Sequence, residues 1–141
     1  MISVVIQSDH GTPNIDGVSD GHHPLSHHGQ DPERIAQLKI IETKILTCLS
    51  DFLDGLKQTS ENGSVLLEQT SVLFGSNLGN ANAHDPRNLP IILAGGKHKH
   101  GRFIQHNKKD NVPLCNLFVS LLQSMGIESG QFGSSTGTLD I

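Results

Sequence analysis

The chain has 141 residues and a mass of 15.2 kDa, which is the size of one compact domain. A formal charge of −4 and an aromatic content of only five Phe argue against nucleic-acid binding. A hydrophobic content of 35% predicts a modest core. No run of about 18 apolar residues occurs, so we expect no membrane-spanning helix, and no signal peptide is visible.

The first predicted element is a short buried strand over residues 2–6, which are β-branched and almost entirely apolar. Residues 8–30 then show no periodicity, and they contain five of the nine histidines. A stretch of this length without regular structure is either functional or a sign that an element within it has been overlooked.

A long amphipathic helix is predicted over residues 32–57. Asp31 is suited to cap its N-terminus, and Pro32 is suited to its first turn. Apolar residues then recur every three or four positions, as they do on the buried face of a helix. Gly55 and the polar run over residues 59–64 are expected to end it.

Further strands are predicted over residues 71–75 and 89–94, with a fourth, short strand over residues 102–104. A second helix is predicted to begin at Pro113, with Gly126 just beyond its end. This order predicts an α/β fold, in which a partial parallel sheet of three to four strands is covered by one long and one shorter helix. Residues 1–141 are expected to form a single domain.

The first candidate site is a histidine-rich loop in which four imidazoles, those of His22, His23, His27 and His28, fall within seven residues. Asp20 adds a carboxylate beside them, and imidazole and carboxylate are ligands of divalent metals. Pro24 disfavours helix at the residue before it, so we do not expect His23 and His27 to form a helical i, i+4 pair. The alternative is a polar loop whose histidines are solvated or bonded to the backbone.

The second candidate site is the Gly- and Asn-rich stretch over residues 75–85, which ends in His84 and Asp85. One short loop rarely supplies a full coordination shell, so His84 is expected to complete a site that His23 and His27 begin. Asp20 and His28 are then a further ligand or a residue that orients one. The alternative is a tight Asn-rich turn. Neither GxGxxG nor a Walker motif occurs, so no nucleotide cofactor is expected.

Five motifs, over residues 17–28, 73–84, 88–96, 113–117 and 132–139, resemble the C-terminal part of the DUF1552 family of uncharacterised bacterial proteins. That family is distantly similar to the alkaline phosphatase and sulfatase superfamily. The resemblance implies that the chain is the C-terminal fragment of a longer protein, with part of an alkaline-phosphatase-like fold. It also implies export to the periplasm or the cell surface.

The resemblance further implies a metal-assisted hydrolase-like domain of the phosphatase/sulfatase type. Zinc, manganese or iron would be held by His23, His27 and His84, acting as a Lewis acid and lowering the pKa of a bound water. Ser76 and Asn77 stand where the superfamily has an Asp-His pair. The alternative is therefore a non-catalytic exported module that binds a partner or has a structural role.

A partial sheet leaves an open edge and an uncovered apolar face. The isolated chain is therefore expected to be poorly soluble, to self-associate, or to require the missing N-terminal part. No nucleic-acid or membrane partner is expected.

Overall fold

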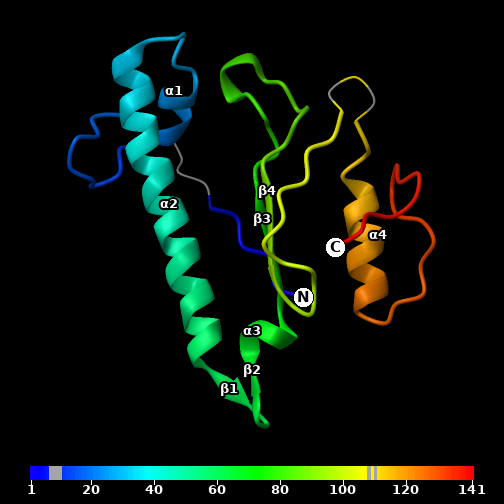
Figure 1. The fold of residues 1–141 in the computed structure, drawn as a ribbon. Helices are drawn as coiled ribbons and strands as arrows, with labels where there is room; N and C mark the ends of the chain where they lie inside the picture. Colours follow the sequence, from blue (N-terminus) through cyan, green and yellow to red (C-terminus); the bar gives the residue numbers. More distant parts are fainter. Residues whose placement is uncertain (7–10, 108, 110) are drawn as a thin grey trace.

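The computed structural model describes residues 1–6, 11–107, 109 and 111–141. One long helix lies on one side of a central two-stranded hairpin, and a shorter helix lies on the other side (Figure 1). In chain order the elements are α1 (His22–Ser26), α2 (Pro32–Gln58), β1 (Ser60–Glu61), β2 (Ser64–Val65), α3 (Leu66–Gln69), β3 (Ser71–Gly75), the 3-10 turn η1 (Ala81–Ala83), β4 (Ile91–Gly95) and α4 (Cys115–Ser124).

The long helix α2 confirms the sequence-based prediction to within one residue. The Asp31 side chain accepts hydrogen bonds from the backbone N–H groups of Glu33 and Arg34, at 2.8 and 3.3 Å, so it satisfies two donors that have no partner inside the helix. At the other end, the Thr59 N–H and Oγ1 groups both bond to the carbonyl of Gly55. The helix ends because Thr59 is extended.

A small hairpin, β1–β2, reverses the chain directly after α2. Its turn is Asn62-Gly63, with φ angles of 51° and 81°. Positive φ at both central residues is typical of the two-residue type I′ turn of a β-hairpin. We predicted only a polar run here, although the Asn-Gly pair is itself a hairpin signal. The short helix α3 then leads into β3.

The predicted parallel sheet, and with it the alkaline-phosphatase-like architecture, is wrong. Within the described residues the sheets are two antiparallel two-stranded hairpins, β1–β2 and β3–β4. Strand β3 lies where we predicted it, and β4 begins two residues later than predicted. A parallel pair needs a crossover connection, usually a helix. Residues 76–90, between β3 and β4, contain no helix except the three-residue turn η1, and the two strands are antiparallel.

The predicted strands over residues 2–6 and 102–104 are also absent from the structure. Both segments are described and unpaired, and their apolar side chains are exposed, with Val4 at 76% and Phe103 at 90%. Apolar, β-branched sequence favours a strand only where a partner strand is available. Neither segment is paired with a strand in the described part of the chain.

The helix α4 forms a small unit with the C-terminal tail. The Ser120 hydroxyl accepts a hydrogen bond from the Leu139 N–H and donates one to the Leu139 carbonyl, at 2.8 and 2.7 Å. The rings of Phe118 and Phe132 meet edge to face, with centroids 5.5 Å apart. Gly126 follows the helix with φ of +77°, which confirms its predicted role as the left-handed residue beyond the helix end.

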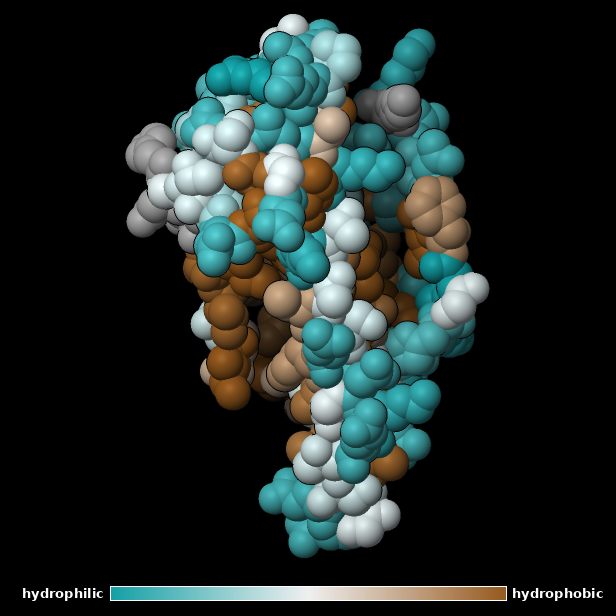
Figure 2. Space-filling view, turned by 90° about the vertical axis from the view of Figure 1, so that its left-hand side faces the viewer, coloured by the Kyte–Doolittle hydropathy of each residue, from teal (hydrophilic) through white to brown (hydrophobic). Residues whose placement is uncertain are grey.

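The core is small. The buried hydrophobic side chains among the described residues are Leu25, Ile41, Leu117 and Val119, and only Leu25 and Val119 are fully buried. Figure 2 shows hydrophobic surface open to solvent beside more hydrophilic surface on the same face of the molecule. No helix among the described residues is long and apolar enough to cross a membrane, in agreement with the sequence analysis.

Candidate metal site

Three of the predicted metal ligands lie side by side. The ring centroids of His23 and His27 are 4.9 Å apart, and those of His27 and His84 are 4.8 Å apart. The ring planes in both pairs are steeply inclined, at 74° and 70°, so each pair meets edge to face. We call His23, His27 and His84 the histidine triad. His27 is its centre, because it contacts both of the others.

The short helix α1 places His23 and His27 on the same side, four residues apart, which corrects our expectation that Pro24 would prevent such a pair. Pro24 is the third residue of α1. The N–H groups of the first turn of a helix have no partner within the helix, so a proline there breaks no hydrogen bond. The buried side chains of Leu25 and Ser26 anchor α1, which packs against α2. The Arg34 guanidinium on α2 donates a hydrogen bond to the His27 carbonyl at 3.1 Å.

His84 comes from the other side of the site, at the end of η1. The Asn80 side chain caps η1 by accepting a hydrogen bond from the Ala83 N–H at 3.2 Å. Asn80 and Asp85 then bridge the base of the turn. His84 itself adopts the left-handed conformation, with φ of 49°, which is uncommon for a residue other than glycine. Backbone strain of this kind concentrates at functional positions.

A hydrogen bond holds the two halves of the site together. The Asn82 Oδ1 atom in η1 accepts from the Gly29 N–H at 2.8 Å, across 53 residues of sequence. This contact brings η1 to the loop that follows α1, and it leaves His84 beside His27. Sequence reasoning did not single out Asn82, and its residue type alone gives no signal for this role.

The other candidate ligands are engaged elsewhere. Asp20 accepts a hydrogen bond from the Gly21 N–H at 2.8 Å and lies 4.0 Å from Arg34, while His28 Nδ1 accepts from the Gln30 N–H at 3.1 Å. Asp85 accepts two hydrogen bonds from the Arg87 guanidinium, each 2.8 Å, and these bonds lower the pKa of Asp85 to about 2. The structure therefore groups the triad and leaves these three side chains with other partners.

The electrostatics of the triad favour a neutral centre. Desolvation lowers the pKa of His27 from its ordinary value of 6.5, and the neighbouring imidazoles of His84 and His23 lower it further. A neutral imidazole has a lone pair free for a metal ion, whereas a protonated one does not. His27 is thus held in the form that a ligand needs at neutral pH.

Two of the ring spacings suit a shared ion. With metal–nitrogen bonds of about 2.0–2.1 Å at tetrahedral angles, the centroids of two imidazole ligands lie about 5.2 Å apart. The observed 4.9 and 4.8 Å are close to that value. Among the described residues, however, no three His, Cys, Asp or Glu side chains are already arranged to hold an ion. The three rings must therefore rotate before their nitrogen atoms can share an ion.

A second pair of histidines lies apart from the triad. His98 Nε2 and Ser71 Oγ are hydrogen-bonded at 2.8 Å, and the rings of His98 and His100 are 6.3 Å apart. His100 lines a pocket of about 400 Å³ near the end of β4. His98 is partly buried, whereas His100 is exposed.

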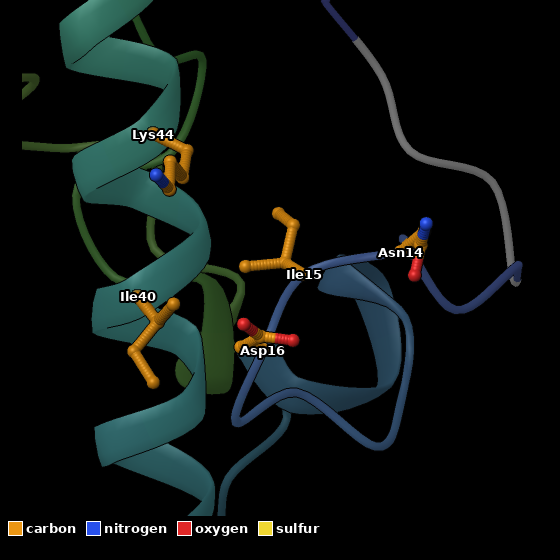
Figure 3. Close-up of a pocket in the computed structure, with 5 residues that line it drawn as sticks. All are labelled: Asn14, Ile15, Asp16, Ile40 and Lys44. Carbon is orange, nitrogen blue, oxygen red and sulfur yellow. The ribbon is translucent and has the colours of Figure 1, made fainter.

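A pocket of about 450 Å³ lies between α2 and the loop before α1 (Figure 3). Its lining combines Ile15 and Ile40 with the charged side chains of Asp16 and Lys44. Ile15 points from the loop toward the helix, between Ile40 and Lys44 in this view. The pocket contains no residue of the triad.

The lowered pKa of His27 makes the stability of the metal-free protein dependent on pH. Above pH 6.5 the imidazole is neutral in both the native and the unfolded state. As the pH falls below 6.5, the unfolded chain binds a proton before the native chain does, so the free energy of unfolding decreases. We expect urea unfolding midpoints to fall from pH 7.5 to pH 5.5, and to fall less in His27→Gln. An equal drop in the two proteins would contradict a shifted His27.

Comparison with protein-family models, with curated proteins and with solved structures gives no match for this chain.

Proposed function

We propose that the chain binds one divalent transition-metal ion through His23, His27 and His84, and that the ion supports metal-assisted hydrolysis. The observation that carries the proposal is that His27 contacts both His23 and His84, with ring spacings of 4.9 and 4.8 Å, although His84 comes from a separate segment of the chain. The proposal concerns this site alone and excludes the alkaline-phosphatase-like architecture, which the antiparallel sheet contradicts. A DUF1552-type, exported origin remains our proposal for the longer protein.

The ligand set favours a particular class of metal. Three neutral nitrogen donors without thiolate suit zinc, copper, nickel or iron, whereas magnesium and calcium prefer oxygen. The nearest carboxylate along the chain, Asp85, is bonded to Arg87 and is not free to add a hard oxygen ligand. We therefore place zinc first and expect manganese to bind more weakly.

The exposure of His23 and His84 supports a catalytic metal site rather than a purely structural one. Structural zinc sites are closed by four protein ligands, and catalytic sites keep three protein ligands and one open position. His23 and His84 are exposed, and Asp20, His28 and Asp85 have other partners. A divalent ion at such a position polarises a carbonyl or phosphoryl oxygen and acidifies water.

The ligands themselves have distinct tasks in this proposal. His27 supplies the central, neutral nitrogen, and the carbonyl of His27 is fixed by Arg34. His84 is delivered by η1, whose position depends on the bond between Asn82 and Gly29. Loss of a residue that orients a ligand typically lowers metal affinity by about 10–100-fold.

Metal analysis and titration test the proposal. Protein purified without an affinity tag is stripped with chelator and titrated separately with zinc and manganese chloride. We expect one zinc equivalent per chain, with manganese weaker, and zinc-dependent cleavage of a p-nitrophenyl phosphate or sulfate ester that is lost in His27→Gln. Binding of less than a tenth of an equivalent of either metal would contradict the site.

A non-catalytic module is the second candidate function, and the hydrogen bond between Asn82 and Gly29 favours it. An ion shared by α1 and η1 would reinforce the same link and would stabilise the fold without turnover. Stoichiometric zinc binding with a raised melting temperature, but no zinc-dependent ester cleavage, would select this candidate.

A further inference from the structure

We propose that two copies of this chain associate by exchanging strands, with residues 2–6 of one copy pairing along the open edge of the β3–β4 hairpin of the other. The inference does not depend on the metal site. It rests on an incomplete sheet, an unpaired strand-like segment, and the amount of surface that the single chain leaves exposed.

The β3–β4 sheet is incomplete. It has two strands, and no third strand pairs with either of them in the described part of the chain. Alternate residues along a strand face opposite sides, so Val72 and Phe74 lie on one face and Leu73 on the other. Both faces are thus apolar, and an isolated two-stranded sheet is at best marginally stable in water.

The segment over residues 2–6 has the composition of the missing strand. In an extended segment Ile2, Val4 and Ile6 would lie on one side and Val5 on the other, so residues 2–6, like β3 and β4, carry apolar side chains on both sides. The segment therefore suits a sheet that is covered on both faces. In this structure it runs as an unpaired stretch, dark blue in Figure 1. Its side chains are largely exposed, with Ile2 at 92% and Val5 at 79%.

The exposed area is large enough to form a dimer. A compact monomer of this mass has an accessible surface of about 7,100 Å², from the usual scaling of area with mass. This chain has 10158 Å². The excess of about 3,000 Å² per chain exceeds the half-share of an obligate homodimer interface, which buries about 2,000–5,000 Å² in total.

A second copy is the occupant that the chain itself specifies. One chain carries both the unpaired strand and the open edge, so two copies related by a twofold axis satisfy each other reciprocally. Both surfaces that such an exchange requires, the strand and the sheet edge, are present in every copy of the chain. Strand addition to an open edge gives affinity through main-chain hydrogen bonds.

The test is the mass of the full chain in solution, measured by size-exclusion chromatography with light scattering over a range of concentrations. We expect twice the chain mass of 15.2 kDa at micromolar concentration. Val4→Pro removes one N–H from the exchanged strand, so it should raise the dimer dissociation constant at least tenfold. The matched control is Ile104→Pro, which places the same residue in another exposed, unpaired apolar segment and should leave the constant unchanged.

Two results would overturn the proposal. A wild-type chain that stays monomeric at every concentration would mean that residues 2–6 fold back onto their own hairpin or that a different protein covers the edge. A dimer that resists Val4→Pro as well as Ile104→Pro would show association through another surface. Far-ultraviolet circular dichroism of each variant checks that the helices are intact, since residues 2–6 belong to no helix or strand of the single chain.

Discussion

Replacing His84 with asparagine is expected to lower the zinc affinity of the triad at least 100-fold. His84 is the ligand that comes from η1, so its loss leaves only the two imidazoles on and beside α1. Loss of a residue that merely orients a ligand already costs 10–100-fold in affinity. Asparagine is chosen over alanine because it tolerates the left-handed conformation that His84 adopts, with φ of 49°.

The matched control is His22→Asn, which removes an imidazole from the same cluster of histidines without touching the triad. His22 lies 3.8 Å from Glu42 on α2, away from the shared position. Isothermal titration of zinc into the wild type and both variants measures the effect. Equal affinities in the three proteins would remove His84 from the site and, with it, the main support for a metal-dependent function.

Replacing Gly79 with alanine is expected to destabilise the protein by about 1–3 kcal/mol, the usual cost of overpacking. A Cβ atom at this position would collide with the carbonyl oxygen of Arg87 and would lie 2.8 Å from that of Asn88. Both obstacles are backbone atoms, so the chain around η1 must move. Because the Gly79 N–H also bonds to the Asp85 carbonyl, we expect the shift to displace His84 and to weaken zinc binding as well.

The control for this variant is Gly55→Ala. Gly55 lies inside α2, and nothing lies within 4 Å of the Cβ atom that alanine would add. Alanine there should stabilise the protein by about 0.5–1 kcal/mol, because glycine costs that much in a helix interior. Thermal melting with and without zinc gives both effects. A Gly79→Ala protein that melts and binds zinc as the wild type does would contradict the described packing of η1.

Local signals in the sequence were sufficient to predict the two longer helices, although α4 begins at Cys115 and not at Pro113 as predicted, and α3 was missed. The bounds of α2 follow from the cap at Asp31 and from a long amphipathic repeat, and the end of α4 follows from Gly126. Both signals act within a few residues, so they do not depend on the rest of the fold. The short helix α1 was missed because a proline usually indicates that the residue before it is extended. Pro24 lies in the first turn of α1, where a proline is tolerated.

Pairing of the strands could not be predicted in the same way. Continuous apolar strands are typical of parallel sheets, yet β3 and β4 are antiparallel. The direction depends on the connection between them, and η1 is too short to be a crossover helix. Residues 2–6 carry a strand signal that depends on a partner strand, and among the described residues they pair with none.

The composition of the triad was predictable, but its geometry was not. The clustering of His23 with His27, and the need for a ligand from outside that loop, both follow from the sequence. The bond between Asn82 and Gly29, which aligns the two segments, has no sequence signature. The partners of Asp20, His28 and Asp85 are likewise visible only in three dimensions.

X-ray absorption spectroscopy at the zinc edge, on the 141-residue chain loaded with one equivalent of zinc, tests the central claim most directly. We expect three imidazole nitrogens at about 2.0–2.1 Å, with one further light atom completing the shell, and loss of one imidazole in His84→Asn. A shell made only of oxygen, or one containing sulfur at about 2.3 Å, would show that His23, His27 and His84 do not share a metal ion.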